Sequence, residues 1–341
     1  MKKNIFEYII KDTKHNFNFR KYKLLKNKKI LITGATGVLG SYFISFFLLL
    51  LKSNYKPKKI TLFYKKKLPS YLEFLKKNKK IKLIRKDLSN LKRLNIDKQD
   101  YIIYLAGYGQ PGKFIKNPIK TYKLNTNSLE LFVNKIKKNG KFLFLSSSEI
   151  YSGLNGKIDE SKVGTTNTNH PRACYIESKR GGETILNNYK NKLKFKPISV
   201  RLCLGFGPGV RKDDERVLHQ FIEKALKFKK IQMLDNGKSL RSYIYITDVL
   251  KMLVNILFYG KKELYNIGGK KIISIKQLAK KISGILKVNF YSSNKNFSKN
   301  LGKAPKNAFV SIKSYEKEFG KINLINIDEG LKKTIGWHKL I

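Results

Sequence analysis

The sequence has few of the residues that cross-link proteins or bind metals: two cysteines, Cys174 and Cys203, and four histidines in 341 residues. Two cysteines cannot build the disulfide framework of a small secreted domain, and they do not stand in a metal-binding spacing. Residues 1–6 also lack the apolar stretch and the small-residue cleavage site of a signal peptide. The sequence therefore predicts a cytoplasmic protein without a metal site.

Acidic residues are scarce as well. Only 23 Asp and Glu accompany 73 Lys and Arg, which gives a formal net charge of +50. Lysine-rich surfaces attract nucleic acid through counterion release. Here the lysines are spread over the whole chain together with abundant Asn and Ile, which indicates a compositional bias that produces solvated faces. We therefore expect no specific nucleic-acid partner, although a basic surface would concentrate an anionic substrate.

Long hydrophobic runs are also missing. The longest apolar segment, residues 38–51, is shorter than the ~20 residues that a bilayer requires. A helix wedged between a sheet and a neighbouring element is expected to be apolar nearly all round. The segment is thus interpreted as a buried helix, and no membrane span is predicted.

A glycine-rich turn precedes this helix. Gly34, Gly37 and Gly40 follow the apolar run of residues 30–32, so the order is strand, tight turn, helix. Glycines let the backbone turn sharply and approach a pyrophosphate, which then rests on the N-terminus of the helix. The residues assigned to this part of a dinucleotide site are Gly34, Thr36, Gly37, Val38, Leu39 and Gly40.

Beyond the turn, segments typical of strands and helices alternate. Strands are expected at residues 30–32, 60–63, 81–84, 101–105, 142–145 and 198–202, and helices at 38–51, 71–77, 118–138, 217–227, 247–258 and 274–286. This alternation predicts an α/β fold: a Rossmann-type doubly wound parallel sheet with a smaller C-terminal α/β substrate-binding lobe. The expected divisions are an N-terminal extension (1–27), an NAD(P)-binding domain (28–203, with segments near 243–268 returning to it) and the lobe (mainly 204–341).

Two polar motifs are expected at the carboxyl edge of this sheet. Tyr175 and Lys179 are four residues apart, so they share one face of a helix, and an ammonium beside the phenol favours the phenolate. Ser146, Ser147, Ser148 and Glu149 directly follow the strand at 142–145. Each motif alone has an ordinary explanation, as a solvated helix face or a capped loop. Together with the glycine turn, and in this order, they indicate an enzyme.

This order of motifs resembles the extended short-chain dehydrogenase/reductase superfamily, that is, the NAD-dependent epimerase/dehydratase family. The resemblance implies NAD as cofactor, a nucleotide-sugar substrate and a homodimer. It implies Tyr175 as general base, Lys179 as the ligand of the nicotinamide ribose and Ser147 as hydrogen-bond donor to the reacting sugar oxygen. Further cofactor contacts implied by the resemblance are Asp87, Leu88, Leu105, Ala106, Gly107 and Asn125.

Within this superfamily, residues 117–121, 171–175, 207–208 with 213–217, and 240–248 are similar to UDP-glucuronate decarboxylases. Glu149 stands where decarboxylases and GDP-mannose-type dehydratases carry Glu, and Ser148 stands where a dTDP-glucose-type 4,6-dehydratase would carry Asp. The resemblance thus favours decarboxylation through a 4-keto sugar, with Glu149 handling a proton near carbon 5. It implies substrate contacts by Ser147, Ser148, Arg241 and Arg216, the arginines clamping the diphosphate.

Several alternatives stay open at this point. Dehydration at carbons 4 and 6 and epimerisation at carbon 4 use the same motifs, and a non-catalytic RNA-binding or assembly protein could share the fold. The chain also departs from the family pattern at two places. Leu204 stands where an Asn usually meets the substrate, and residues 63–66 lack the acidic residue that normally binds the adenosine ribose. The adjacent lysines would permit the 2′-phosphate of NADP, but NAD is the expected cofactor.

Overall fold

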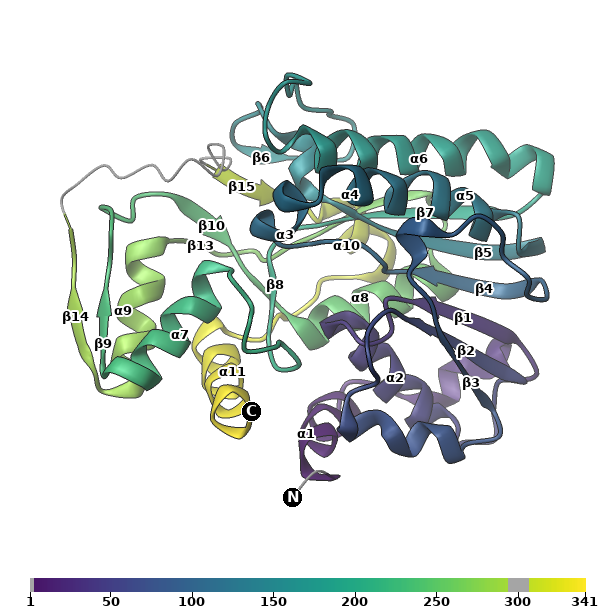
Figure 1. The fold of residues 1–341 in the computed structure, drawn as a ribbon, viewed down its shortest axis with the longest axis horizontal. Helices are drawn as coiled ribbons and strands as arrows, with labels where there is room; N and C mark the ends of the chain where they lie inside the picture. Colours follow the sequence, from purple (N-terminus) through teal and green to yellow (C-terminus); the bar gives the residue numbers. More distant parts are fainter. Residues whose placement is uncertain (1–2, 294–306) are drawn as a thin grey trace.

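A seven-stranded parallel sheet forms the centre of the larger part of the molecule (Figure 1). The computed structural model describes residues 3–293 and 307–341. The strand order is β3-β2-β1-β4-β5-β7-β12, so the order reverses between β1 and β4. A crevice for ligands opens at such a reversal, outside the carboxyl ends of the strands. The strands are β1 (Lys29–Thr33), β2 (Lys59–Tyr64), β3 (Ile81–Arg85), β4 (Gln99–Tyr104), β5 (Ile136–Ser147), β7 (Lys196–Leu202) and β12 (Leu264–Ile267). This architecture confirms the predicted Rossmann-type α/β fold.

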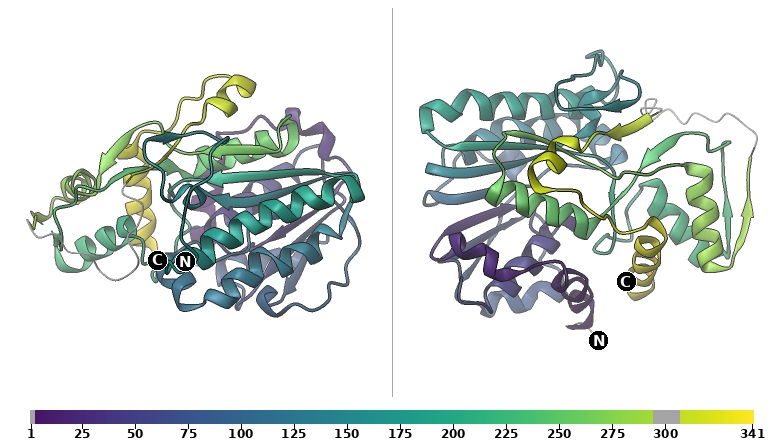
Figure 2. Two further views of the ribbon diagram at one scale, coloured as in Figure 1. Left: turned by 90° about the horizontal axis from the view of Figure 1, so that it is seen from above. Right: turned by 180° about the vertical axis from the view of Figure 1, so that it is seen from behind.

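Helices cover both faces of this sheet (Figure 2). Ile30 and Ile32 of β1 pack in one core with α1 (Lys3–Lys14), α2 (Val38–Leu50) and α8 (Ile246–Tyr259), while Leu31 packs in a second core. That second core contains residues of α4 (Pro118–Asn125), α5 (Asn127–Val133) and α6 (Ala173–Leu193). Because both faces are covered, β1 is a continuous apolar run and its residues do not alternate with polar ones.

The smaller lobe is built around short sheets beside this body (Figure 1). Strand β10 lies between β13 and β15, antiparallel to the first and parallel to the second, and β6 completes this sheet. Two further pairs are β8 with β11 and β9 with β14. The elements are β6 (Lys157–Ile158), β8 (Gly205–Phe206), α7 (Val217–Phe228), β9 (Lys230–Gln232), β10 (Leu240–Ser242), β11 (Ile244–Tyr245), β13 (Ile272–Ser274), α9 (Ile275–Leu286), β14 (Asn289–Tyr291), β15 (Asn307–Val310) and α11 (Ile327–Leu340). Helix α10 (Lys313–Phe319) packs instead on β12 and α8 of the body.

The N-terminal segment is tied to both parts of the molecule by one buried carboxylate. Asp12, near the end of α1, accepts hydrogen bonds from the hydroxyls of Tyr42 on α2 and Tyr245 on β11, each at 2.8 Å. Its other oxygen lies 3.2 Å from Nζ of Lys333 on α11. A 3₁₀ helix, η1 (Phe19–Leu25), then leads into β1. Asp12 therefore joins the first and last helices of the chain to the body.

One predicted helix is wrong. Instead of a helix over residues 118–138, α4 ends at Asn125, α5 ends at Val133, and β5 begins at Ile136. Thr126 breaks the helix with φ −120° and ψ −87°, and its hydroxyl donates to the carbonyl of Tyr122 at 2.8 Å. The helical bonds from the Thr126 amide to the Tyr122 carbonyl and from the Glu130 amide to the Thr126 carbonyl are kept, so the break is a local change of φ and ψ that the sequence pattern does not register. The helix expected at 71–77 is a 3₁₀ helix, η2 (Ser70–Lys77).

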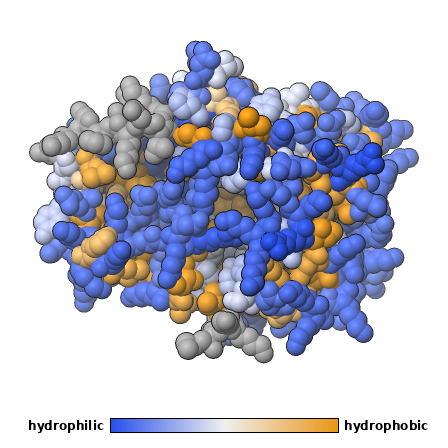
Figure 3. All heavy atoms as spheres, viewed as in Figure 1, coloured by the Kyte–Doolittle hydropathy of each residue, from blue (hydrophilic) through white to orange (hydrophobic). Residues whose placement is uncertain are grey.

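The surface agrees with the interpretation of the lysines as solvated. On the face shown in Figure 3, hydrophilic residues predominate and apolar ones form scattered groups. Large exposed apolar side chains are distributed over separate elements, for example Ile119 on α4, Phe228 at the end of α7 and Tyr291 on β14. No helix among the described residues has the length and apolar character needed to cross a bilayer.

Candidate active site

A cavity of about 1020 Å³ opens at the carboxyl edge of the large sheet. Its walls come from the turn between β1 and α2, from the ends of β2, β4, β5 and β7, and from the lobe. The structure brings eighteen of the nineteen predicted site residues to it: Gly34, Thr36, Gly37, Val38, Leu39, Gly40, Asp87, Leu88, Leu105, Ala106, Gly107, Ser147, Ser148, Glu149, Tyr175, Lys179, Arg216 and Arg241. Asn125 lies behind the wall, where its Nδ2 donates to the Ser178 hydroxyl at 2.9 Å.

The β1–α2 turn has the form of an anion cradle. Gly34 has φ +66°, a conformation that favours glycine, and a Cβ at Gly40 would lie 2.4 Å from the Gly34 carbonyl oxygen. The hydroxyl of Thr33 accepts hydrogen bonds from the amides of Leu105 and Ala106 at 3.1 and 3.0 Å, which fixes the end of β4 beside the turn. Gly37, the N-cap of α2, provides no side chain to cap the helix amides. These residues therefore fit the pyrophosphate of a dinucleotide.

The adenosine end of the cavity is basic. Tyr64, Lys65 and Lys66 line it where β2 ends, and Asp87 lines it from the end of β3. The ammonium of Lys65 lies 2.9 Å from the Asp87 carboxylate and 3.1 Å from the Tyr108 hydroxyl. The Asp87 carboxylate at this end of the cavity is thus already paired with Lys65.

The other end of the cavity, called the catalytic end because it holds the residues predicted to be catalytic, is centred on Tyr175 in the first turn of α6. Its ring stacks on Phe114 with centroids 4.6 Å apart and an interplanar angle of 5°. Burial raises the pKa of Tyr175 to about 12, while a hydrogen bond with Ser147 and the positive charges of Arg172 and Arg216 act in the opposite direction. The Ser147 and Tyr175 hydroxyls are therefore adjacent, so one substrate oxygen could contact both.

Lys179 lies one helical turn farther along α6. Its Nζ donates to the Leu145 carbonyl at 2.7 Å and stands 5.7 Å from the centre of the Tyr175 ring. Burial lowers the pKa of Lys179 to about 7, although the charge of Glu183 raises it in part. The cations that lower the Tyr175 pKa here are Arg172 and Arg216. The sequence predicted neither the lowered pKa of Lys179 nor the part of the two arginines in lowering the pKa of Tyr175.

This buried amine predicts a specific pH dependence of stability. In the unfolded chain Lys179 has its ordinary pKa of 10.5, and in the folded chain burial lowers that pKa to about 7. Between these values the unfolded state binds more protons, so this group makes the free energy of unfolding rise with pH. Lys179→Met should remove that rise, while turnover is lost. Thermal unfolding of cofactor-free protein from pH 7 to 10 measures this dependence of stability on pH. Stability-versus-pH curves that run parallel for Lys179→Met and wild type would contradict the prediction. Lys192→Met, on the exposed side of α6, is the control.

Two residues of the catalytic end were missed from the sequence. Arg172, the N-cap of α6, forms a forked ion pair with Glu149, with Nε 2.9 Å from Oε2 and Nη2 bonded to Oε1. The guanidinium carbon also lies 5.2 Å from the centre of the Phe114 ring. Phe114 belongs to the short helix α3 (Pro111–Lys116). Arg172 lies in the segment 171–175, which is similar to decarboxylases. That similarity was the one feature of the sequence that could have pointed to this arginine.

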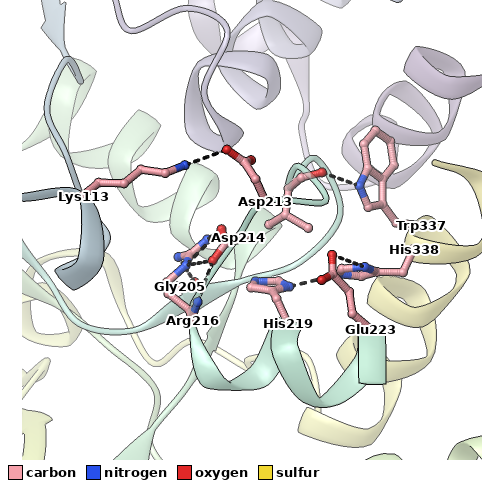
Figure 4. A network of polar contacts seen from close by, with 10 residues as sticks. Lys113, Gly205, Asp213, Asp214, Arg216, His219, Glu223, Trp337 and His338 are labelled. Atoms are coloured by element: carbon pink, nitrogen blue, oxygen red, sulfur yellow. Dashed lines mark hydrogen bonds and ion pairs between the residues drawn. The ribbon is translucent and has the colours of Figure 1, made fainter. Parts of the chain in front are cut away.

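The loop between β8 and α7 forms the opposite wall (Figure 4). Arg216 is held by a forked ion pair with the buried Asp214, with Nη2 2.7 Å from Oδ2, and its Nη1 lies 3.3 Å from the Gly205 carbonyl oxygen. Lys113 of α3, which lines the cavity, forms an ion pair with Asp213 of this loop at 3.1 Å. Beside the loop, Trp337 of α11 donates to the Val210 carbonyl at 2.8 Å. Asp214 and the Gly205 carbonyl thus fix the position of the Arg216 guanidinium in the cavity wall.

Arg241, the other predicted substrate ligand, lines the cavity from β10. Burial lowers the pKa of its guanidinium, while Tyr243, Cys203 and Glu149 raise it, and the nearby Arg172 lowers it. Arg241 therefore lies within electrostatic range of the Glu149–Arg172 pair. Leu204 lines the same region, where the family pattern has Asn.

The fold is a parallel sheet whose strand order reverses between β1 and β4, with a glycine cradle, a buried Tyr–Lys pair and a neighbouring serine at its carboxyl edge. These features define a dinucleotide-dependent enzyme of the short-chain dehydrogenase type. The model of the NAD dependent epimerase/dehydratase family matches residues 30–268. The chain belongs to this family and is an NAD-dependent enzyme. The membership confirms the predicted superfamily and the prediction of NAD as cofactor.

Curated relatives are similar at low identity over most of the chain. UDP-glucuronic acid decarboxylase 1 of Xenopus tropicalis is 26% identical over 318 residues, which cover 92% of this chain and 72% of the relative. UDP-glucuronic acid decarboxylase 6 of Arabidopsis thaliana is 28% identical over 270 residues, covering 76% and 75%. A solved structure, UDP-glucuronic acid 4-epimerase from Bacillus cereus with UDP-glucuronic acid and NAD, superposes with a TM-score of 0.76 at 22% identity and covers 92% of this chain and 99% of that one.

Proposed function

We propose that the protein decarboxylates a nucleotide-linked uronic acid, with UDP-glucuronate as the first candidate, through a 4-keto sugar. The observation that carries this proposal is the group around Tyr175: a hydrogen-bonded Ser147, a carboxylate at Glu149, and the guanidinium groups of Arg172 and Arg241 near that carboxylate. A substrate with a carboxylate on the sugar and a diphosphate needs cations at both places. The similarity to UDP-glucuronic acid decarboxylases supports the same choice.

Each residue has a definite part in the oxidation step. The β1–α2 turn would hold the pyrophosphate of NAD, and Lys179 would hold the nicotinamide ribose. The cofactor would supply the hydride acceptor for carbon 4. Tyr175 takes the proton of the hydroxyl at carbon 4, and Ser147 donates a hydrogen bond to the same oxygen as it becomes a ketone.

Loss of carbon dioxide follows from the ketone. The carboxylate on carbon 5 is then β to a carbonyl, so the bond between carbons 5 and 6 breaks and its electron pair passes into the carbonyl at carbon 4. Carbon 5 next takes a proton, which solvent supplies beside Glu149. Tyr175 returns its proton to the oxygen at carbon 4 as the ketone is reduced. The net change is consumption of one proton and release of one carbon dioxide, with NAD regenerated.

A panel of nucleotide sugars tests this proposal. The purified protein is incubated with UDP-glucuronate, UDP-glucose, dTDP-glucose and GDP-mannose, and the products are followed by mass spectrometry and NMR. We expect UDP-glucuronate to lose the mass of carbon dioxide. Loss of the mass of water from a neutral sugar would identify a dehydratase, and an isomer of unchanged mass an epimerase. Either result, or no conversion of any sugar, would overturn decarboxylation. Tyr175→Phe protein, prepared identically, excludes a contaminating activity.

A further inference from the structure

Arg172 is buried where a positive charge is unfavourable. Its side chain is only 4% exposed, and its carbonyl accepts from the amides of Tyr175 and Ile176 at the start of α6. The N-terminus of a helix carries the positive end of the helix dipole, so a cation there is repelled as well as desolvated. This place in the fold therefore requires strong compensating contacts.

Two contacts provide that compensation, and both lead to the catalytic end. The guanidinium fork engages both oxygens of Glu149, the geometry in which arginine differs most from lysine. The same guanidinium lies against Phe114, which in turn stacks on Tyr175. Arg172 thus contacts Glu149 directly and Tyr175 through the Phe114 ring. Both Glu149 and Tyr175 are assigned to proton transfer.

Stability alone does not explain this arrangement. Replacing a buried ion pair by apolar residues of similar volume is often neutral or stabilising. Arg180, two turns farther along α6, offers a comparison: it pairs with Glu177 at 2.8 Å and donates to the carbonyls of Ile150 and Gly164 at 2.8 and 2.7 Å. Its contacts hold a loop to the helix and do not reach Tyr175.

We propose that Arg172 is a positioning residue for the reaction, which fixes Glu149 as a hydrogen-bond acceptor and, through Phe114, fixes the ring plane of Tyr175. The assignment of the steps rests on the proposed function. With both oxygens of Glu149 held by N–H donors, each oxygen keeps a lone pair for a further donor. Glu149 therefore orients the water that protonates carbon 5, and is not itself the proton donor.

The kinetic test compares Arg172→Lys and Arg172→Gln with the wild type. Arg172→Lys keeps the charge but loses the fork and the planar contact, so kcat should fall roughly ten- to a hundredfold, as expected for misplaced groups, with little change in KM. Arg172→Gln also removes a cation that lowers the Tyr175 pKa, so the acid limb of the pH profile should move to higher pH. The other groups around Tyr175, namely Ser147, Glu149, Lys179 and Arg216, are unchanged in both variants.

A second readout does not depend on the substrate. Cys174 is half-buried, and its Sγ lies 3.6 Å from the Phe114 carbonyl oxygen, whereas Cys203 is buried. If Arg172 holds Phe114 in place, Arg172→Lys should speed the reaction of Cys174 with a thiol reagent several-fold, while Arg180→Lys should not. If no nucleotide sugar of the panel is turned over, the proposed function is wrong, but thiol labelling still tests whether Arg172 holds Phe114 in place.

The outcomes separate positioning from a structural role. If Arg172→Gln keeps the wild-type kcat and pH profile, or if thiol labelling of Arg172→Lys equals that of Arg180→Lys, the proposal is wrong. It is equally wrong if kcat and thermal stability fall together to the same extent in both lysine variants. Arg180→Lys is expected to lower the unfolding temperature without moving the pH profile.

Discussion

Tyr175→Phe is expected to lower turnover about a hundredfold or more while the protein stays folded. The substitution removes the hydroxyl that is bonded to Ser147 but keeps the ring that stacks on Phe114. Without the phenol, no group at this position takes the proton from the hydroxyl at carbon 4, so the hydride step stops first. The measurement is single-turnover absorbance of the reduced nicotinamide, together with steady-state product formation.

The matched control is Tyr189→Phe on the same helix. The Tyr189 hydroxyl bonds Glu130 and does not line the cavity, so its loss should leave turnover unchanged. Normal formation of reduced cofactor by Tyr175→Phe would show that the proton acceptor is another group. A parallel loss in Tyr189→Phe would instead show that α6 is sensitive to any change.

The parts of the site that were predictable are local in sequence. The glycine turn is determined by backbone geometry within seven residues, because Gly34 needs φ +66° and Gly40 has no room for a side chain. The spacing of Tyr175 and Lys179 places them on one helix face whatever the rest of the fold does. The spacing did not show that the Lys179 ammonium would turn to the Leu145 carbonyl.

The parts that were missed depend on packing between separate elements. Glu149, Arg172 and Phe114 meet because a 3₁₀ turn, η4 (Ser148–Tyr151), the start of α6 and the short α3 converge on one point. Phe114 is 58 residues before Arg172, and no periodicity links them. The break after Asn125 was missed as well, since the apolar pattern does not register the non-helical φ and ψ of Thr126.

Gly40→Ala is expected to weaken cofactor binding by roughly ten- to a hundredfold, since the added methyl group would overlap the turn itself. Its Cβ would lie 2.4 Å from the Gly34 carbonyl oxygen and 2.6 Å from that of Ala35, and neither backbone atom can move without deforming the cradle. Overpacking of this kind costs about 1–3 kcal/mol, and each ~1.4 kcal/mol taken from binding is a tenfold loss of NAD affinity. Calorimetric titration with NAD and thermal unfolding measure the two effects.

The same substitution should have the opposite effect on stability at Gly284. That residue lies in α9, and a Cβ built there meets nothing within 4 Å, so Gly284→Ala adds only helix propensity, worth up to ~1 kcal/mol of stabilisation. Because the chemistry of the change is identical, the contrast isolates the close approach of the turn to α2. If Gly40→Ala binds NAD as tightly as Gly284→Ala, α2 can move away from Gly34 without cost. The cradle would then not be what holds the pyrophosphate.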